Sequence, residues 1–367
     1  MGKIYFKKHG DSRDNFAVLF RKDGNREQIA LNKDTLEFDN SKFDHLCFEF
    51  GGERTGKVYP GALTLGVEYK MNEKIGKHLT YLFSKGIEKT GRVENFVLQD
   101  SQNLSYREDK SKKISVFLPN SYDGMMPHDI LFFFDAQNLF GSAGEYTENG
   151  DPYGSWQLDV VLNEIYREYG TNIIGVGIDN ADQYREQELF MNPEDFGALT
   201  PLATALPDED YSHGYLDGLS DFIVNTLHPF IKAKYCITDG NIGIGGASMG
   251  GIAAFYCGLR EMGFYKYVIS YSPAFALYET EAFERWFERL NFMKNADKLP
   301  KVHIYCGEGD PLERLLVGAS KDIRGKMMQY GYPSERIFET FDAEKPHNEE
   351  SWRLILPQSF TYLLDLK

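Results

Sequence analysis

From Asp129 onward the sequence alternates between short, continuously apolar runs and longer segments with helical spacing. The apolar runs include DILFFFDA from Asp129, TNIIGVGID from Thr171, NIGIGGA from Asn241, YKYVISYS from Tyr265 and KVHIYCGE from Lys301. The segments between them carry apolar residues three and four positions apart, as amphipathic helices do. Strands that are apolar throughout need cover on both faces. The alternation therefore predicts an α/β fold with a mostly parallel central sheet flanked by helices.

Residues 1–92 differ from the rest of the chain. They contain β-prone runs such as NFAVLFRK, HLCFEFGG and ALTLGVEYK, separated by Gly, Asn and Asp. This pattern predicts a small, sandwich-like β domain of unknown role over 1–92, followed by the α/β domain over 93–367. We expect IEKTGRVENFVL and KKISVFLPNSYDG to form edge strands that open the second domain.

Composition narrows the classes of function. A net charge of −15 argues against nucleic acid or an anionic membrane as partner, because both attract positive surfaces. No apolar stretch is long enough to span a membrane, and the first residues lack the apolar core of a secretory signal, so we expect a cytoplasmic protein. The four cysteines have no metal-like spacing, and we expect neither a metal nor another cofactor. The sequence carries no signal of the oligomeric state.

The stretch Gly246-Ala247-Ser248-Met249-Gly250 has the form G-x-S-x-G, between a predicted strand and a predicted helix. In that context the motif is typical of a nucleophile elbow, a tight turn that exposes a serine hydroxyl above the sheet. Small residues before and after the serine leave room for the strained backbone. The motif predicts Ser248 as a nucleophile.

A serine hydroxyl needs a base, and in α/β-hydrolases a histidine follows the serine and the acid along the chain. His347 lies in a loop between the last strand and the last helix, where its ring can reach the elbow. His303 lies inside an apolar strand, which is typical of a core histidine. His213, in a long insertion, is a rival upstream of Ser248. We expect His347 to be the base.

The acid should follow the strand that contains His303. Asp310 lies just beyond that strand, and we favour it as the carboxylate that orients His347. Glu308 is close enough to compete, and Asp342 is a more remote alternative. The alternative interpretation of Asp310 is a turn residue before Pro311.

Acyl transfer also needs hydrogen-bond donors for the developing oxyanion. The elbow supplies the backbone N–H of Met249, and the loop after the strand from Asp129 should supply the N–H of Gln137. Loss of one such donor costs roughly 10²–10³ in kcat.

The segment 181–218 is a long, weakly patterned insertion after a strand, where open α/β sheets bind ligands. Its REQE sequence places Arg185 and Glu188 near the expected pocket mouth. An Arg–Glu pair there is more often a structural clamp than a substrate contact. Trp156 lies near the same edge and has the same two interpretations, packing or pocket.

The segments FFFDAQNLF, GSWQLDVVLNEI, IGIGGASMGG, YCGEGDP and PHNEESWRLILPQSFTYLL, in this order, resemble the putative esterase family of α/β-hydrolases. That family includes esterase D, feruloyl and acetyl-xylan esterases and enterochelin esterases, and the resemblance runs from about residue 95 to the C-terminus. It implies Ser248 as nucleophile, Asp310 as acid and His347 as base, with the amides of Gln137 and Met249 as the oxyanion hole. The chain departs from the family at Ala136, where relatives usually carry glycine.

Together these features predict a serine carboxylic-ester hydrolase that works through an acyl-enzyme. We expect a small-molecule or carbohydrate ester as substrate, of the sugar-linked, phenolic or siderophore type. An acyltransferase of the same fold would use the same residues, with a sugar hydroxyl in place of water. A hydrolase fold used only as a binding module is the alternative from another class.

Overall fold

The structure is a computed structural model. It describes residues 91–140, 155–204 and 211–366 and, before residue 91, eight strands together with the two residues that precede the third strand.

The eight N-terminal strands form two four-stranded sheets. Their bounds are β1 Gly2–Phe6, β2 Asn15–Arg21, β3 Arg26–Ala30, β4 Thr35–Phe38, β5 Phe43–Phe50, β6 Glu53–Arg54, β7 Val67–Met71 and β8 Leu79–Phe83. One sheet has the order β4-β1-β7-β8 and the other β3-β2-β5-β6. All pairs are antiparallel except β1 with β7. The β-rich character predicted for this part of the chain is present, and the boundary between residues 92 and 93 stays a prediction.

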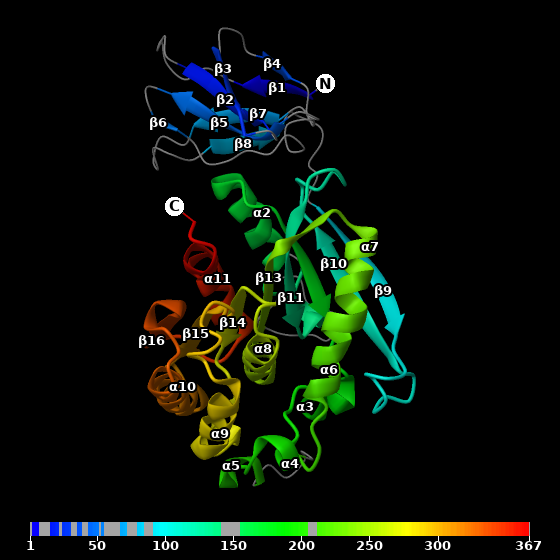
Figure 1. Cartoon of the computed structure of the whole chain (residues 1–367), viewed down its shortest axis with the longest axis vertical. Coiled ribbons are helices and arrows are strands. Elements are labelled where there is room, and N and C mark those ends of the chain that lie inside the picture. The colour runs from blue at the N-terminus through cyan, green and yellow to red at the C-terminus, as the bar shows by residue number, and fades with distance from the viewer. Residues whose placement is uncertain are drawn as a thin grey trace.

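The larger sheet has eight strands in the order β16-β15-β14-β13-β11-β12-β10-β9. Their bounds are β9 Arg92–Gln99, β10 Ser111–Leu118, β11 His128–Phe134, β12 Ile173–Ile178, β13 Ile237–Ala247, β14 Tyr267–Tyr271, β15 Lys301–Gly307 and β16 Ile337–Asp342. The strands from β16 to β12 are parallel to their neighbours, and only the β12–β10 and β10–β9 pairs are antiparallel. This is the predicted α/β-hydrolase arrangement, and β9 is the edge strand that we expected (Figure 1). The expectation of a second edge strand was wrong for β10, which pairs with β12 on one side and β9 on the other.

Helices cover both faces of this sheet (Figure 1). They are α2 Leu158–Tyr169, α3 Arg185–Glu188, α4 Pro193–Phe196, α5 Pro201–Thr204, α6 Leu216–Phe222, α7 His228–Lys234, α8 Met249–Arg260, α9 Thr280–Leu290, α10 Pro311–Gln329 and α11 Glu349–Leu363. A π-helical turn, Ile223–Leu227, joins α6 to α7. The predicted insertion contains α3, α4 and α5, so it is more regular than its sequence pattern indicated.

Alternation along the strands divides the core into two layers. On β14, Val268 packs into the layer under α6 to α10, whereas Tyr267 and Ile269 pack into the layer under α2 and α11. Neighbouring side chains of a strand point to opposite faces, so a strand between two helical layers must be apolar throughout. This is the physical origin of the continuous apolar runs in the sequence.

Helix α10 is the long element that the strand–helix pattern did not predict. It starts at Pro311, with Asp310 as its N-cap: Asp310 Oδ1 accepts the backbone N–H of Glu313 at 2.9 Å. The sequence Asp310-Pro-Leu-Glu313 is a helix start, with an N-cap, proline at the first position and an acidic residue at the third. This helix carries Glu313, whose contact with His347 is described below.

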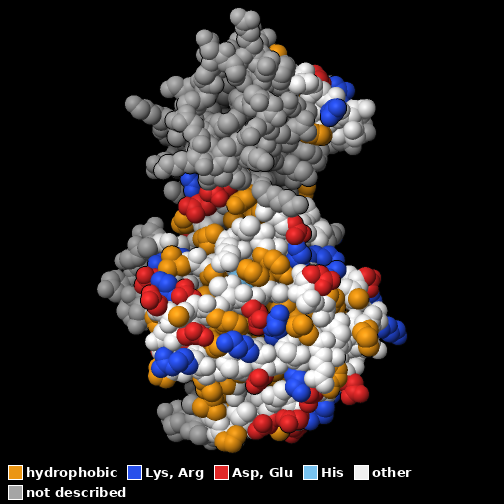
Figure 2. Space-filling model, turned by 90° about the vertical axis from the view of Figure 1, so that its left-hand side faces the viewer, with side chains coloured by type: hydrophobic (Ala, Val, Ile, Leu, Met, Phe, Trp, Pro, Cys, Tyr) orange, Lys and Arg blue, Asp and Glu red, His pale blue; other side chains and the backbone are white. Residues whose placement is uncertain are grey.

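Acidic and basic side chains are interspersed on the face drawn in Figure 2, and the described basic residues do not gather there into one patch. Among the described residues, no helix is long and apolar enough to cross a membrane. The described thiols of Cys236, Cys257 and Cys306 are free. Each follows a tyrosine in an apolar run, which predicts a buried thiol; Cys257 and Cys306 are buried, whereas Cys236 is only partly buried. Cys47 lies outside the residues whose side chains the structure describes.

Candidate active site

The carboxyl ends of the parallel strands meet at one edge of the sheet, where open α/β sheets place their sites. Asp135 follows β11, Ser248 follows β13 and Ser272 follows β14. The loops after β15 and β16 lead to Glu313 and His347 at the same edge. Residues far apart in the sequence therefore come together because their strands are parallel neighbours.

Ser248 occupies the sharp turn between β13 and α8. Its φ of 57° and ψ of −121° are strained for a residue with a side chain, at a cost of roughly 1–3 kcal/mol. A Cβ on Gly246 would lie 2.4 Å from the carbonyl oxygen of Gly250, and one on Gly250 would lie 2.9 Å from Asp135 Oδ2. Gly246 is thus required by close backbone approach and Gly250 by the nearby Asp135 carboxylate, and Ser248 stays partly exposed. The predicted elbow geometry is present.

His347 makes its ring contact with Glu313. The distance from His347 Nδ1 to Glu313 Oε1 is 2.9 Å, and the Glu313 side chain is fully buried. Glu313 Oε2 accepts the backbone N–H of Gly307 at 2.9 Å. A carboxylate beside one imidazole nitrogen fixes the ring orientation and leaves the other nitrogen to exchange a proton.

The sequence predicted that Asp310 orients the His347 ring, but in the structure Asp310 contacts the backbone of His347 and the ring contacts Glu313. Asp310 Oδ2 accepts the backbone N–H of His347 at 2.8 Å, while Oδ1 caps α10. Burial raises the pKa of Asp310, but the N–H groups of Glu313 and His347 outweigh it and hold the pKa below its usual value. Asp310 therefore anchors the histidine loop, and Glu313, one helical turn later, meets the imidazole. Glu308 has no contact with the ring among the described residues.

The Ser248 turn and the segment after His347 are each hydrogen-bonded to a neighbouring part of the sheet edge. Ser248 donates its backbone N–H to Tyr271 O at 2.9 Å. Asn138, in the loop after β11, donates from Nδ2 to Oε1 of Glu349 at 2.9 Å. Glu349 is two residues after His347 in the sequence. Within the described residues, no hydrogen bond joins the Ser248 hydroxyl directly to the His347 ring.

The loop after β11 is held by an ion pair. Asp135 adopts a left-handed conformation, with φ of 58°. Its carboxylate accepts both Nε and a terminal nitrogen of Arg185, at 2.7 and 2.9 Å. Such a bidentate pair fixes geometry as well as adding energy. It holds the turn between β11 and Gln137, and the neighbouring Ala136 adopts no positive φ.

Two of the predicted pocket residues have other roles. Arg185 pairs with Asp135 and Glu186, whereas Glu188 is buried against Lys112 and accepts the hydroxyl of Tyr106 at 2.6 Å. The predicted Arg–Glu pair is therefore wrong as a pair, although both residues do act as clamps. Burial lowers the pKa of Lys112, and Glu188 opposes this effect.

Trp156 is a packing residue rather than part of a pocket. It is 3% exposed and stacks between Trp352 and Tyr271, with ring centroids 5.3 and 6.0 Å away. His303 is a core histidine, as predicted. Its two ring nitrogens contact Ser359 and Thr340, and burial lowers its pKa to about 3. His213 is exposed.

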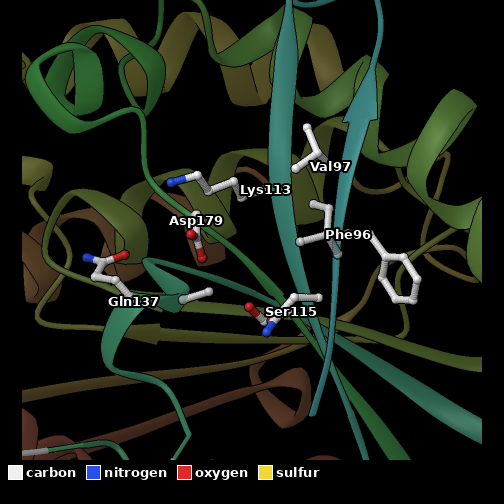
Figure 3. A pocket seen from close by; sticks show the side chains of 9 residues that line it. Phe96, Val97, Lys113, Ser115, Gln137 and Asp179 are labelled. Atoms are coloured by element: carbon white, nitrogen blue, oxygen red, sulfur yellow. The ribbon is translucent and has the colours of Figure 1, made fainter. Parts of the chain in front are cut away.

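A cavity of about 510 Å³ lies beside the loop after β11 (Figure 3). Its wall includes Asn95 and Val97 from β9, Lys113 and Ser115 from β10, Gln137, and Asp179 at the end of β12. The ring of Phe96 points away from the cavity and packs against Phe230, 5.1 Å between centroids. The cavity is therefore lined mainly by polar side chains. Among the described residues, no group of three or more His, Cys, Asp or Glu could hold a metal ion.

Comparison with known proteins agrees with this fold. The family model described as "Putative esterase" matches residues 105–363. The BES protein from Bacillus cereus aligns with a TM-score of 0.54 and 15% identity over 77% of this chain and 98% of its own. The siderophore hydrolase EstB from Aspergillus nidulans aligns with a TM-score of 0.53 and 16% identity, over 77% of this chain and 98% of its own. A ferulic acid esterase aligns with a TM-score of 0.49 and 15% identity, over 76% of this chain and 99% of its own. No curated protein matches the sequence.

The chain belongs to the putative esterase family, as its sequence motifs predicted. It is an enzyme of the serine esterase type, built on the α/β-hydrolase fold.

Proposed function

We propose that this esterase uses Ser248 as nucleophile, His347 as general base and Glu313 as the acid that orients the base. The observation that carries the proposal is the hydrogen bond between Glu313 and His347 Nδ1, at the edge where Ser248 stands in a strained turn. With Nδ1 engaged by a carboxylate, Nε2 is the nitrogen that takes the serine proton.

The reaction follows from these roles. Ser248 Oγ attacks the ester carbonyl while His347 Nε2 removes its proton. The oxyanion accepts the backbone N–H groups of Met249 and Gln137, for which the described structure contains no other hydrogen-bond partner. His347 then gives its proton to the departing alcohol, and an acyl group remains on Ser248. Water, activated by the same base, releases the acid and restores the enzyme.

Covalent labelling tests this assignment directly. A fluorophosphonate reacts only with an activated serine, so we expect one equivalent to bind the native protein at Ser248, located by mass spectrometry of the peptides. Ser248→Ala and the unfolded wild-type protein should take up no label. Labelling at another residue, or equal labelling of Ser248→Ala, would contradict the proposal.

The cavity beside Gln137 supports an assignment to the acyl part of the substrate. His347 must lie beside the departing alcohol, and its loop follows β16, at one end of the strand order. The cavity lies over β12, β10 and β9, at the other end, with the Ser248 strand between them. A group that extends past Gln137 into the cavity is therefore attached to the acyl carbon.

The cavity wall favours a hydroxylated acyl group over an alkyl chain. It offers the amides of Asn95 and Gln137, the hydroxyl of Ser115, and one charge of each sign from Lys113 and Asp179. Such a wall gives an alkyl chain little apolar contact and offers a hydroxyl several partners. Ser115 lies on β10, two strands from β11, or roughly 10 Å by the usual strand spacing. An acyl chain of hexanoate length, plus a hydrogen bond, covers about that distance.

A matched pair of esters tests this preference. We expect kcat/KM to be roughly tenfold higher for p-nitrophenyl 6-hydroxyhexanoate than for p-nitrophenyl hexanoate, the value of about one good hydrogen bond. Asn95→Leu should reduce the preference severalfold. Gln99→Leu is the control, because Gln99 is also an exposed amide on β9 but does not line the cavity. Equal rates for the two esters, or equal effects of the two variants, would contradict this assignment.

A further inference from the structure

Ser272 is a buried serine that no motif in the sequence singled out. It follows β14 directly, its φ is 40°, and it is fully buried. Its backbone N–H donates to Tyr305 O at 2.5 Å. A serine with positive φ at the carboxyl edge of the sheet is a costly feature, of the kind that gathers at functional sites.

The hydroxyl of Ser272 links two residues of the site. Trp352 Nε1 lies 2.9 Å from Ser272 Oγ, and Ser272 Oγ lies 2.6 Å from Glu313 Oε1. An indole N–H can only donate, so Ser272 Oγ accepts from Trp352. Ser272 therefore donates its one hydroxyl proton to Glu313. The chain of hydrogen bonds runs from Trp352 through Ser272 to Glu313.

The Glu313 carboxylate therefore has three donors. Oε1 receives both Ser272 and the His347 ring, and Oε2 receives the N–H of Gly307. Trp352 also packs edge-on against the His347 ring, with centroids 4.9 Å apart and planes at 84°. The same indole thus contacts the base and orients the serine that holds the acid.

We propose that Ser272, oriented by Trp352, is a positioning residue that holds the Glu313 carboxylate in the orientation His347 requires. This inference rests on the function proposed above. Ser272 contacts neither the substrate nor the imidazole, and it acts only through Glu313. Its loss removes one of the three donors that orient the carboxylate and leaves the indole N–H without its partner, so the base is held less well in both chemical steps.

Ser270 provides a matched control for the test. It is also a fully buried serine, two residues earlier on β14, and its hydroxyl donates to Gly251 O at 2.9 Å. In the full chain, Ser272→Ala should lower kcat for p-nitrophenyl acetate roughly tenfold with KM unchanged, as expected for a hydrogen bond to a charged group. Ser270→Ala should stay within about twofold of the wild type. A purely structural role would instead give the two variants the same kinetics and the same loss of thermal stability.

A double-mutant cycle with Glu313→Gln separates action through Glu313 from any other effect. If Ser272 works through the carboxylate, Ser272→Ala should lower kcat in the wild-type background and change it less than about twofold in the Glu313→Gln background. Trp352→Phe, which keeps a ring but removes the N–H, should reproduce part of the Ser272→Ala effect on kcat. An equal loss of kcat in both backgrounds would overturn the inference, and so would kinetics of Ser272→Ala that match those of Ser270→Ala. If Ser248→Ala is inactive in the same experiments, the proposed function stands even though the inference fails. Full activity of Ser248→Ala would instead reject the proposed function itself.

Discussion

Replacement of Ser248 by alanine is expected to lower kcat for p-nitrophenyl acetate by roughly 10⁴–10⁶, as loss of the nucleophile does in serine hydrolases. The alanine variant keeps the strained turn and the N–H groups of Met249 and Gln137, so a residual rate above that of water should remain. Stopped-flow measurement should show a burst of p-nitrophenol, about one per active site, for the wild type and no burst for the variant.

Ser248→Gly separates the loss of activity from any loss of folding. Glycine has no Cβ to clash at φ 57° and ψ −121°, so this variant should be about 1 kcal/mol more stable than the wild type. Its activity should be as low as that of Ser248→Ala. A protein that is more stable and inactive would assign the hydroxyl to catalysis, whereas turnover above a few per cent in either variant would reject Ser248 as nucleophile.

The second large effect is expected at Glu313. Glu313→Gln should lower kcat by roughly 10²–10⁴, because an amide can present its NH₂ group to His347 Nδ1 and select the wrong tautomer of the imidazole. The replacement keeps the size of a fully buried side chain, so packing around it is preserved. The measurement is kcat with p-nitrophenyl acetate, together with thermal unfolding as a check of the fold.

Asp310→Asn is the comparison that distinguishes the two acids. Asparagine caps helices about as well as aspartate, so α10 should persist, and we expect kcat to fall less than about tenfold through the weakened hold on the His347 backbone N–H. The sequence alone favoured the opposite ranking. If Asp310→Asn lost far more activity than Glu313→Gln, Asp310 would be the acid and the Glu313–His347 contact would be a structural one.

The elbow was predictable because its signal is local. Gly246, Ser248 and Gly250 are close in the sequence, and the strand and helix on either side have strong periodicity of their own. The core position of His303 was likewise predictable from the apolar strand around it. His347 lies between the last strand and the last helix, as predicted, because those two elements carry clear periodic patterns of their own.

The errors arose where a side chain's partner is distant in sequence. Glu188 pairs with Lys112 on β10, and Arg185 pairs with Asp135, which directly follows β11. For Trp156 the sequence left packing and pocket open, and the aromatic stack with Trp352 and Tyr271 decides for packing. The contact between Glu313 and His347 was not predicted for a different reason: it depends on the helix that begins at Pro311, which the strand–helix pattern did not indicate. The N-cap pattern Asp310-x-x-Glu313 is a sequence signal that would have shown Asp310 to be engaged by the backbone.

By itself, the sequence determined the strand–helix order, the place of the tight turn that carries Ser248 and the family, because apolar periodicity and small residues around a turn act over a few neighbouring positions. Only the tertiary structure decided which carboxylate meets His347, which serine supports that carboxylate, and which side chains line the cavity beside Gln137. These pairings depend on which loops the parallel strands place side by side at one edge of the sheet. They also depend on α10, in which the Glu313 side chain lies about one helical turn beyond Asp310. A periodic pattern along the chain predicts neither the placement of these loops nor the partner of a side chain on the helix.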